Sequence, residues 1–304
     1  MAYSSGGLIQ ATDFNTRATS VNNLWGVGSG NSGYGQSGTA LNTNISGTVA
    51  ATDWATMIAR MSTMQQHQAN NTTGIPSQPS SGGIITYLSS LDTAVTSLQN
   101  NRLTSYALSS ATGAVTTNNS STWNTSKTLT WTFTFASGDA ARYFFNTGGY
   151  LQLVSTGNTL NESQWNSFIN TGFSSLNIYA NSIQHNGTVG TLTRNTYLNT
   201  QGYYNLTTTP TEYLRLTDTG TGNSAYNSNY LRVSLSSNGT QGSNGDAGSV
   251  ITVTFYLYNA DTNTFQLPLS GTSTGTVQYF QSETTYLSSS WGTPTWANTV
   301  NSVV

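Results

Sequence analysis

Residues 250–258, with the sequence VITVTFYLY, give the strongest strand signal in this chain of 304 residues. Apolar and other residues alternate along the segment, and successive side chains of a β-strand point to opposite faces. The first face is wholly apolar and carries Ile251, Val253, Phe255 and Leu257. The opposite face carries Tyr256 and Tyr258, so the segment predicts a half-buried strand that needs neighbours of similar pattern.

A second alternating segment lies at 128–135, where threonines alternate with large apolar residues. The apolar positions are Leu129, Trp131, Phe133 and Phe135. Weaker patterns predict strands at 150–154, 212–217, 230–235 and 276–280 and a short helix at 162–168. Strands separated by turns rich in Gly, Asn and Ser predict an antiparallel β-sandwich over residues 106–304, with an irregular tail at 291–304.

The N-terminal part, residues 1–105, follows the helical period instead. Apolar spacing predicts helices over 9–25, from a cap at Thr52 or Asp53 to 68–71, and over 84–103. The stripe of the second helix is Trp54, Met57, Ile58, Met61 and Met64, and that of the third is Ile84, Leu88, Leu91, Val95 and Leu98. Short helices make a thin core, which we expect to be completed by a partner or by the C-terminal part. The predicted fold class is therefore α+β, with a short helical N-terminal part followed by an antiparallel β-sandwich.

The composition excludes several classes of function. Only 6% of residues are charged and the net charge is −2, with basic residues scattered singly, so we expect no nucleic-acid partner. The chain has no cysteine, which excludes disulfides, thiolate zinc sites and thiol nucleophiles. No apolar run is long enough to span a bilayer, and the first residues lack a signal-peptide pattern, so we expect no membrane partner and synthesis in a cytoplasm. An uncharged surface rich in hydroxyl and amide groups suits packing against copies of the chain or other proteins.

A glycine-rich stretch at 24–38, LWGVGSGNSGYGQSG, contains a G-x-G-x-x-G match at 28–33, and Asp53 follows Gly33 by twenty positions. A dinucleotide site needs a buried strand before the first glycine and a helix opening after it. The preceding residues predict a helix, and Tyr34 to Gly38 cannot open one. We therefore interpret the stretch as a tight glycine loop that permits close approach of another chain, and predict no cofactor.

Four segments together resemble virion structural proteins of tailed bacteriophages, especially marine and cyanobacterial ones. They are FNTRATSVNNLWGVGSGNSGYGQSG (14–38), TDWATMIARMSTMQQHQ (52–68), FTFASGDAARYFFNTGGYLQL (133–153) and NESQWNSFIN (161–170). They occur in the expected order, whereas the C-terminal third is similar only in its richness in strands. The resemblance implies a component of the phage particle, without indicating neck, tail, baseplate, fibre or capsid surface.

Aromatic residues in these segments are the candidate assembly contacts: Trp25, Tyr34, Trp54, Tyr143, Phe144 and Phe145. In the stretch 141–149, ARYFFNTGG, the aromatic residues would anchor a corner of the core, and Asn146 with the glycine pair would turn the chain into the next strand. Arg142 is expected to pair with Asp139 at this turn.

Catalytic chemistry is not indicated. The acidic residues are far apart, and His67 and His185 are the only histidines, expected at a helix end and in a turn. Asp246 and Asp261 lie in turn sequences without a calcium-loop pattern. We predict no catalytic and no metal-binding residue.

Tyrosines and tryptophans of the C-terminal part leave one alternative open, because aromatic rings stack on sugars. The residues concerned are Tyr203, Tyr204, Tyr226, Tyr230, Trp291 and Trp296. We expect a non-enzymatic structural protein of a tailed phage virion, tail- or neck-associated, which contacts other virion proteins and copies of itself as a homo-oligomer. The alternatives are a capsid decoration protein and an adhesin for a host-surface glycan.

Overall fold

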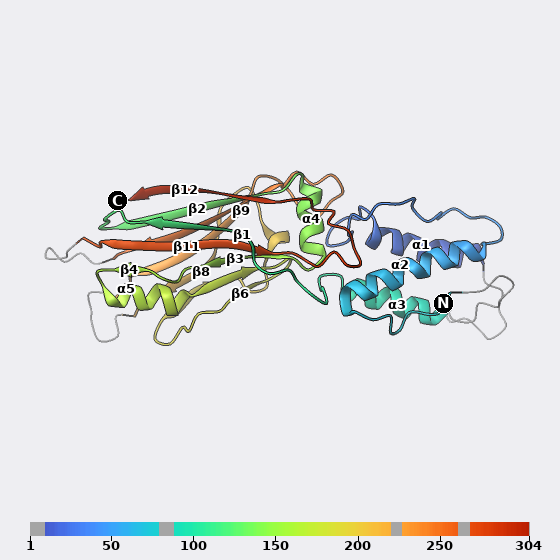
Figure 1. Cartoon of the computed structure of the whole chain (residues 1–304), viewed down its shortest axis with the longest axis horizontal. Coiled ribbons are helices and arrows are strands. Elements are labelled where there is room, and N and C mark those ends of the chain that lie inside the picture. Colours follow the sequence, from blue (N-terminus) through green and yellow to red (C-terminus); the bar gives the residue numbers. More distant parts are fainter. Residues whose placement is uncertain (1–9, 79–87, 220–226, 261–267, 304) are drawn as a thin grey trace.

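A computed structural model describes residues 10–78, 88–219, 227–260 and 268–303. The molecule is elongated, with a group of helices at one end and two packed antiparallel sheets at the other (Figure 1). The predicted class, α+β with N-terminal helices followed by an antiparallel sandwich, is confirmed. Two hydrophobic cores are present, one in the helical part and one between the sheets.

The helical part consists of α1 (Ala11–Trp25), α2 (Ala51–Ala69) and α3 (Leu88–Asn100). The predicted stripe of α2 is buried throughout, and Leu91, Val95 and Leu98 of α3 are buried with it, while Ile84 lies outside the described residues. The predicted cap of α2 is wrong by two or three positions, because the helix already begins after Ala50. Asp53 lies inside the first turn, where its carboxylate accepts the N–H of Ala50 at 3.2 Å.

A C-terminal segment completes the helical core, as the thin helices led us to expect. Leu287 is fully buried among α1, α2 and α3, whereas Trp291, four residues later, is buried in the sandwich core. Ser288 donates its N–H to Gln36 Oε1 at 2.9 Å, and the Ser290 hydroxyl donates to the carbonyl of Tyr34 at 2.6 Å. The segment 287–291 therefore packs into both hydrophobic cores and connects the helical part to the sandwich.

Both sheets are antiparallel. In spatial order the first contains β1 (Thr112–Asn119), β11 (Gly271–Phe280), β3 (Tyr150–Val154), β5 (Ser175–Ile178) and β6 (Ile183–His185), and β4 (Thr159–Leu160) also pairs with β11. The second contains β12 (Thr295–Val303), β2 (Ser126–Thr134), β10 (Val250–Tyr258), β9 (Tyr230–Ser237), β8 (Thr211–Thr217) and β7 (Thr193–Tyr197). A 3-10 turn, η2 (Tyr203–Asn205), lies between β7 and β8.

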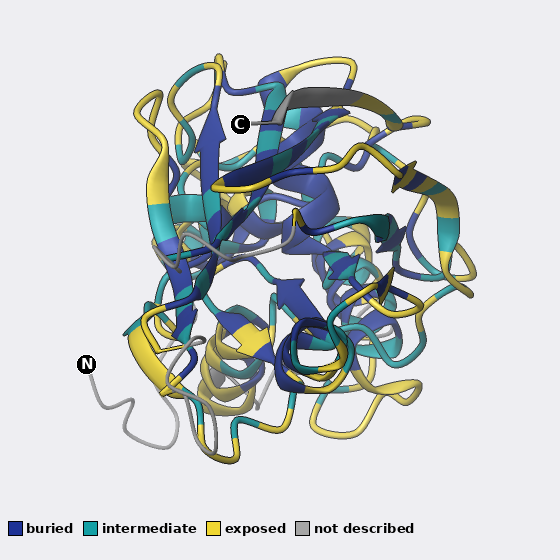
Figure 2. Ribbon diagram, turned by 90° about the vertical axis from the view of Figure 1, so that its left-hand side faces the viewer, coloured by how far each residue is buried: buried dark blue, intermediate teal, exposed yellow. Residues whose placement is uncertain are grey.

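Strand β10 lies in the middle of its sheet, as its apolar alternation predicts. Val253 pairs with Trp131 on β2 and with Leu235 on β9, and all three side chains point into the sandwich. Figure 2 views the molecule from the sandwich end and shows the buried residues on the inner strands, with the exposed ones mainly in the surrounding loops. The register places Tyr256 and Tyr258 on the outer face.

Two expectations for the C-terminal part are wrong. The tail expected to be irregular forms β12, which pairs with β2 so that Trp296 lies opposite Phe133. The stretch expected to be a turn forms α4 (Gly138–Asn146), a helix buried on nearly every side at the sandwich end nearest α1–α3 (Figure 1). The turn follows the helix instead, at Gly148, whose φ is +91°.

The predicted helix at 162–168 is present and longer. It begins as α5 (Ser163–Ser167) and continues as a π-helix, η1 (Phe168–Phe173). A wider π turn is rare in proteins and is found disproportionately at functional sites. Ser174, directly after it, has a positive φ of 55° although it is not glycine.

Candidate functional site

The glycine-rich stretch is a tight loop between α1 and α2. Gly28, Gly30, Gly33, Gly35 and Gly38 all have positive φ. Helix α1 ends at Trp25, directly before it, and the chain after it is irregular as far as α2, so the strand and helix of a dinucleotide turn do not flank it. A Cβ atom at Gly33 would lie 2.2 Å from the carbonyl oxygen of Val27, which shows why this position needs glycine.

This loop docks on α4 through a fully buried arginine. Arg142 donates from Nη1 to the carbonyls of Val27 (2.6 Å) and Ser32 (2.9 Å), from Nη2 to Asp139 (2.7 Å) and from Nε to Asp246 (3.0 Å). We call Arg142, Asp139, Asp246 and these two loop carbonyls the Arg142 clasp. The predicted pair with Asp139 is confirmed, whereas Asp246, expected only as a turn residue, is a second partner.

Neighbouring groups strengthen the clasp. Asn146 donates to the carbonyls of Ser32 (2.7 Å) and Gly33 (2.8 Å), and it accepts the hydroxyl of Tyr204. Burial acts to raise the pKa of Asp139, but hydrogen bonds from Arg142 and from backbone N–H groups of the Asp246 loop outweigh it and hold this pKa below its usual value. The clasp thus joins the helical part and the sandwich by charge-assisted hydrogen bonds.

The candidate assembly contacts lie mostly inside the chain. Tyr34, Trp54, Tyr143, Phe144 and Phe145 are buried within the described chain, and their expected role in contacts between subunits stays a prediction. Within the chain they serve the cores: the Trp54 ring packs edge-on against Phe14, and the Phe145 ring stacks on Tyr203.

Trp25 is the exception among these candidates, because it is part exposed. It lies under the guanidinium of Arg60, and its indole N–H donates to the carbonyl of Ser37 at 3.1 Å. Val27, two residues on, is one of the exposed large apolar residues of the described chain. Trp25 is therefore the only one of the six candidates whose side chain a partner can reach.

His67 lies in the last turn of α2, as expected, but its partner differs, and His185 lies in a strand where a turn was expected. His67 is buried in α2 and places Nε2 3.1 Å from the carbonyl oxygen of Thr147, on the turn after α4, rather than bonding to its own helix end. Burial lowers its pKa to about 4, and the hydrogen bond to Thr147 only partly opposes this. His185 belongs to β6 rather than to a turn, and burial followed by the nearby Arg194 lowers its pKa.

The outer face of β8, β9 and β10 carries a cluster that the sequence did not predict. Tyr230 and Tyr258 stack with ring centroids 4.8 Å apart, and the guanidinium of Arg215 lies 4.4 Å from the Tyr230 ring. Arg232 lies in the same way 4.5 Å from Tyr256. We call these five residues the tyrosine–arginine cluster. Cation–π and ring stacking hold their side chains in place while leaving them part exposed.

The cluster lies at the end of the sandwich away from the helices. Tyr258 is paired with Ser126 at the start of β2, the strand that runs toward α4. Glu212 fixes Arg215 through two hydrogen bonds of 2.9 and 2.6 Å, and a shallow hollow of about 550 Å³ lies beside them. The far end of the molecule thus presents preorganised tyrosine and arginine side chains.

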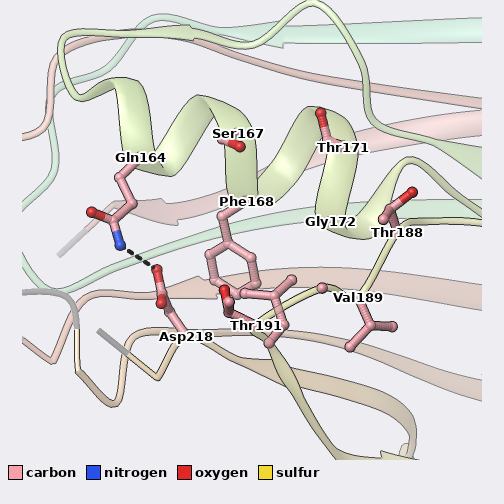
Figure 3. Close-up of a pocket in the computed structure, with 11 residues that line it drawn as sticks. Gln164, Ser167, Phe168, Thr171, Gly172, Thr188, Val189, Thr191 and Asp218 are labelled. Atoms are coloured by element: carbon pink, nitrogen blue, oxygen red, sulfur yellow. Dashed lines mark hydrogen bonds between the residues drawn. The ribbon is translucent and has the colours of Figure 1, made fainter. Parts of the chain in front are cut away.

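A narrower cleft of about 200 Å³ lies between α5–η1, the loop 188–192 and the end of β8. Figure 3 shows Gln164 and Asp218 facing each other across it, joined by a hydrogen bond of 3.0 Å from Nε2 to Oδ2. Phe168 lies between these two residues and the loop. Asp218 is only 4% exposed, so a carboxylate sits at the bottom of a small hollow.

The aromatic residues proposed for stacking on sugars do not form such a surface. Tyr203 and Trp291 are fully buried, and the Tyr204 hydroxyl is bonded to Asn146. Trp296 packs against Phe133, and the Tyr230 ring is stacked on Tyr258, while Tyr226 lies outside the described residues. The five described residues therefore do not form one continuous exposed surface of rings.

Comparisons with protein-family models, with curated proteins and with solved structures each find no match for the chain. Among the described helices, none combines the length and apolar character that crossing a bilayer requires.

Proposed function

We propose that the chain is a non-enzymatic structural component of a tailed phage virion, associated with the tail or neck, which works by protein–protein contacts. The observation that carries the proposal is the tyrosine–arginine cluster. Tyrosine and arginine are enriched in the energetically dominant positions of protein interfaces. Because the side chains of this cluster are already held by stacking, a partner would bind them with little further loss of conformational entropy.

The way in which the two halves are joined also supports a structural role. The Arg142 clasp and the segment around Leu287 hold the helical part and the sandwich as one elongated body. A body of this kind can be anchored at its helical end, where Trp25 is part exposed, and still present the cluster at its far end.

The acidic residues support the same proposal, because most of the described ones have structural partners. Asp13 and Asp53 accept backbone N–H groups at helix starts, Asp92 pairs with Arg17, Glu212 with Arg215, and Asp139 and Asp246 with Arg142. Acidic groups engaged in this way stabilise the fold and position arginines.

The native mass of the purified chain, measured by light scattering on a size-exclusion column, tests the contact surface. We expect a closed homo-oligomer, and we expect Tyr256→Ala/Tyr258→Ala to shift it to monomer. The matched control is Thr252→Ala/Thr254→Ala, on the same face of the same strand. A trimer would favour a fibre, and a six- or twelve-fold ring would favour the neck or tail.

Location in the particle needs a separate test. An antiserum against the chain should label purified particles of the phage that encodes it, on the tail or neck. Label spread over the capsid would favour the alternative of a decoration protein. Absence of the chain from purified particles, together with a monomeric native mass, would overturn the proposal.

A further inference from the structure

The narrow cleft between α5–η1, the loop 188–192 and Asp218 has no role in the protein–protein contacts of the proposed function. From its lining we infer that it binds one ring of a neutral saccharide. This inference goes beyond the proposed function and does not depend on it, because the cleft and the tyrosine–arginine cluster have no lining residue in common.

The size of the cleft limits the ligand. Its volume is about 200 Å³, whereas sites for drug-sized molecules start at about 300 Å³. A water molecule takes up about 30 Å³ of liquid, so the cleft has room for about six waters. A single sugar ring fits a hollow of this size, with the remainder of a longer glycan lying outside.

The chemistry of the lining limits the ligand further. Among the described residues that line the cleft there is no arginine, lysine or histidine, and Asp218 contributes a carboxylate, so an anionic ligand is disfavoured. Asp218 is the one acidic residue among the described residues of the lining, whereas a dedicated calcium site commonly offers several carboxylates. A neutral ligand that carries hydroxyl groups is compatible with this lining and can add hydrogen bonds to those that Asp218 already accepts.

The polar and apolar parts of the lining match the two sides of a sugar ring. Asp218 accepts hydrogen bonds, Gln164 both donates and accepts, and further hydroxyls come from Ser167, Thr171, Thr188 and Thr191. Phe168, Val189 and Leu192 supply an apolar wall for the C–H face of the ring. A pyranose combines hydroxyl groups with such a face in one small molecule.

The walls of the cleft are fixed rather than loose. Thr188 donates its N–H to the carbonyl of Thr171 at 3.0 Å, which holds the loop against the π-helix. A Cβ at Gly172 would lie 2.5 Å from Leu192, and one at Gly187 would lie 2.0 Å from the carbonyl oxygen of Gly172, so both glycines permit the close approach. The π-helix and the positive φ of Ser174 adjoin this packing, and uncommon backbone of this kind often accompanies function.

The test is saturation-transfer NMR on the full chain with the methyl glycosides of glucose, galactose, mannose and N-acetylglucosamine. At least one is expected to show transfer to its ring protons, with millimolar affinity. Asp218→Asn should weaken binding by about tenfold or more, because hydrogen bonds to a charged acceptor are the strong ones in such a site. No transfer to any of the four would overturn the inference.

Two further variants keep the test independent of folding. Thr191→Val removes one hydroxyl from the exposed rim of the cleft and should lower the affinity for the same sugar several-fold. Thr254→Val, on the outer face of β10, should leave that affinity unchanged. Equal affinities of these two variants would overturn the inference. So would preferential binding of an organic ammonium ion, such as choline, over all of the sugars.

Discussion

Arg142 and Asp246 lie 104 positions apart in the chain, yet Nε of the arginine donates to the aspartate at 3.0 Å, and both side chains are almost fully buried. Together with Asp139 and two carbonyls of the glycine-rich loop, they hold the helical part against the sandwich. The joint therefore depends on a buried cation whose partners come from its own helix and from two distant segments.

Loss of this cation should be costly. Arg142→Ala removes the positively charged partner of the buried carboxylate of Asp246 and the arginine donor to the carbonyl of Val27, so we expect the free energy of unfolding to fall by about 3–5 kcal/mol. Chemical denaturation measured by circular dichroism checks this. The matched control is Arg232→Ala, whose side chain is 38% exposed on the sandwich surface, and which should cost less than about 1 kcal/mol. An unchanged midpoint for Arg142→Ala would contradict the structural role of the clasp.

Acid should weaken the same joint in a defined range. The pKa of Asp139 is lowered from 3.8 by its hydrogen bonds, despite its partial burial, so its contribution to stability is present above the unfolded-state pKa and is lost as pH falls below it. Melting temperatures recorded from pH 6 to pH 3 should drop steeply below about pH 4. Asp139→Asn should have a lower melting temperature at neutral pH, and its melting temperature should decrease less below about pH 4 than that of the parental chain. If the melting temperature of Asp139→Asn fell with pH as that of the parental chain does, Asp139 would not contribute to the loss of stability in acid.

A second effect of pH should appear at milder acidity. His67 has a pKa of about 4 in the folded chain against an ordinary 6.5, so between these values the unfolded state binds a proton that the folded state excludes. Stability therefore falls as pH is lowered through this window, by about 3 kcal/mol in total. His67→Gln should flatten the slope of unfolding free energy against pH, whatever its effect at pH 7. His185→Gln should remove a further part, because the pKa of His185 is also lowered. If neither variant changed the slope of unfolding free energy against pH, the two histidines would not be the source of this pH dependence.

The glycine-rich loop allows a test with a close control. Gly33 has a φ of +91°, and a Cβ there would meet the carbonyl of Val27, so Gly33→Ala should destabilise the chain by about 1–3 kcal/mol. At Gly47 nothing lies within 4 Å of an added Cβ, and Gly47→Ala should change stability by less than about 0.5 kcal/mol. Thermal unfolding of Gly33→Ala and Gly47→Ala under the same conditions compares the two positions. Similar melting temperatures would argue against a tight loop around Gly33.

The sequence was most informative where a single period continued for several residues. Strand β10 and the buried stripe of α2 were predicted well, because alternation and helical spacing record directly which side chains face a core. Helix α4 was missed because it is only nine residues long and ends just before a glycine pair, so that Asn146 and these glycines were interpreted as part of a turn. Strand β12 was missed because its few apolar side chains are separated by Asn, Thr and Ser, and its pairing with β2 depends on the rest of the sheet.

The candidate sites depended even more on distant residues. The pair Arg142–Asp139 was predictable from a spacing of three residues, whereas Asp246 joins it only through the fold. The tyrosine–arginine cluster assembles from β8, β9 and β10, and Asp218 meets Gln164 across 54 positions. The alternation in β10 did place Tyr256 and Tyr258 on one face, and that was the one available signal for the cluster.

The burial of Leu287 in the helical core has a consequence for how the protein is made. Helices α1, α2 and α3 leave the ribosome early, but the residue that closes their core is translated roughly 10–40 s after α3 at ordinary elongation rates. Until then the growing chain carries an open apolar surface that chaperones and proteases can recognise. A product cut short before Leu287 by a damaged message never closes this surface, so only chains translated past this residue reach the stable folded state.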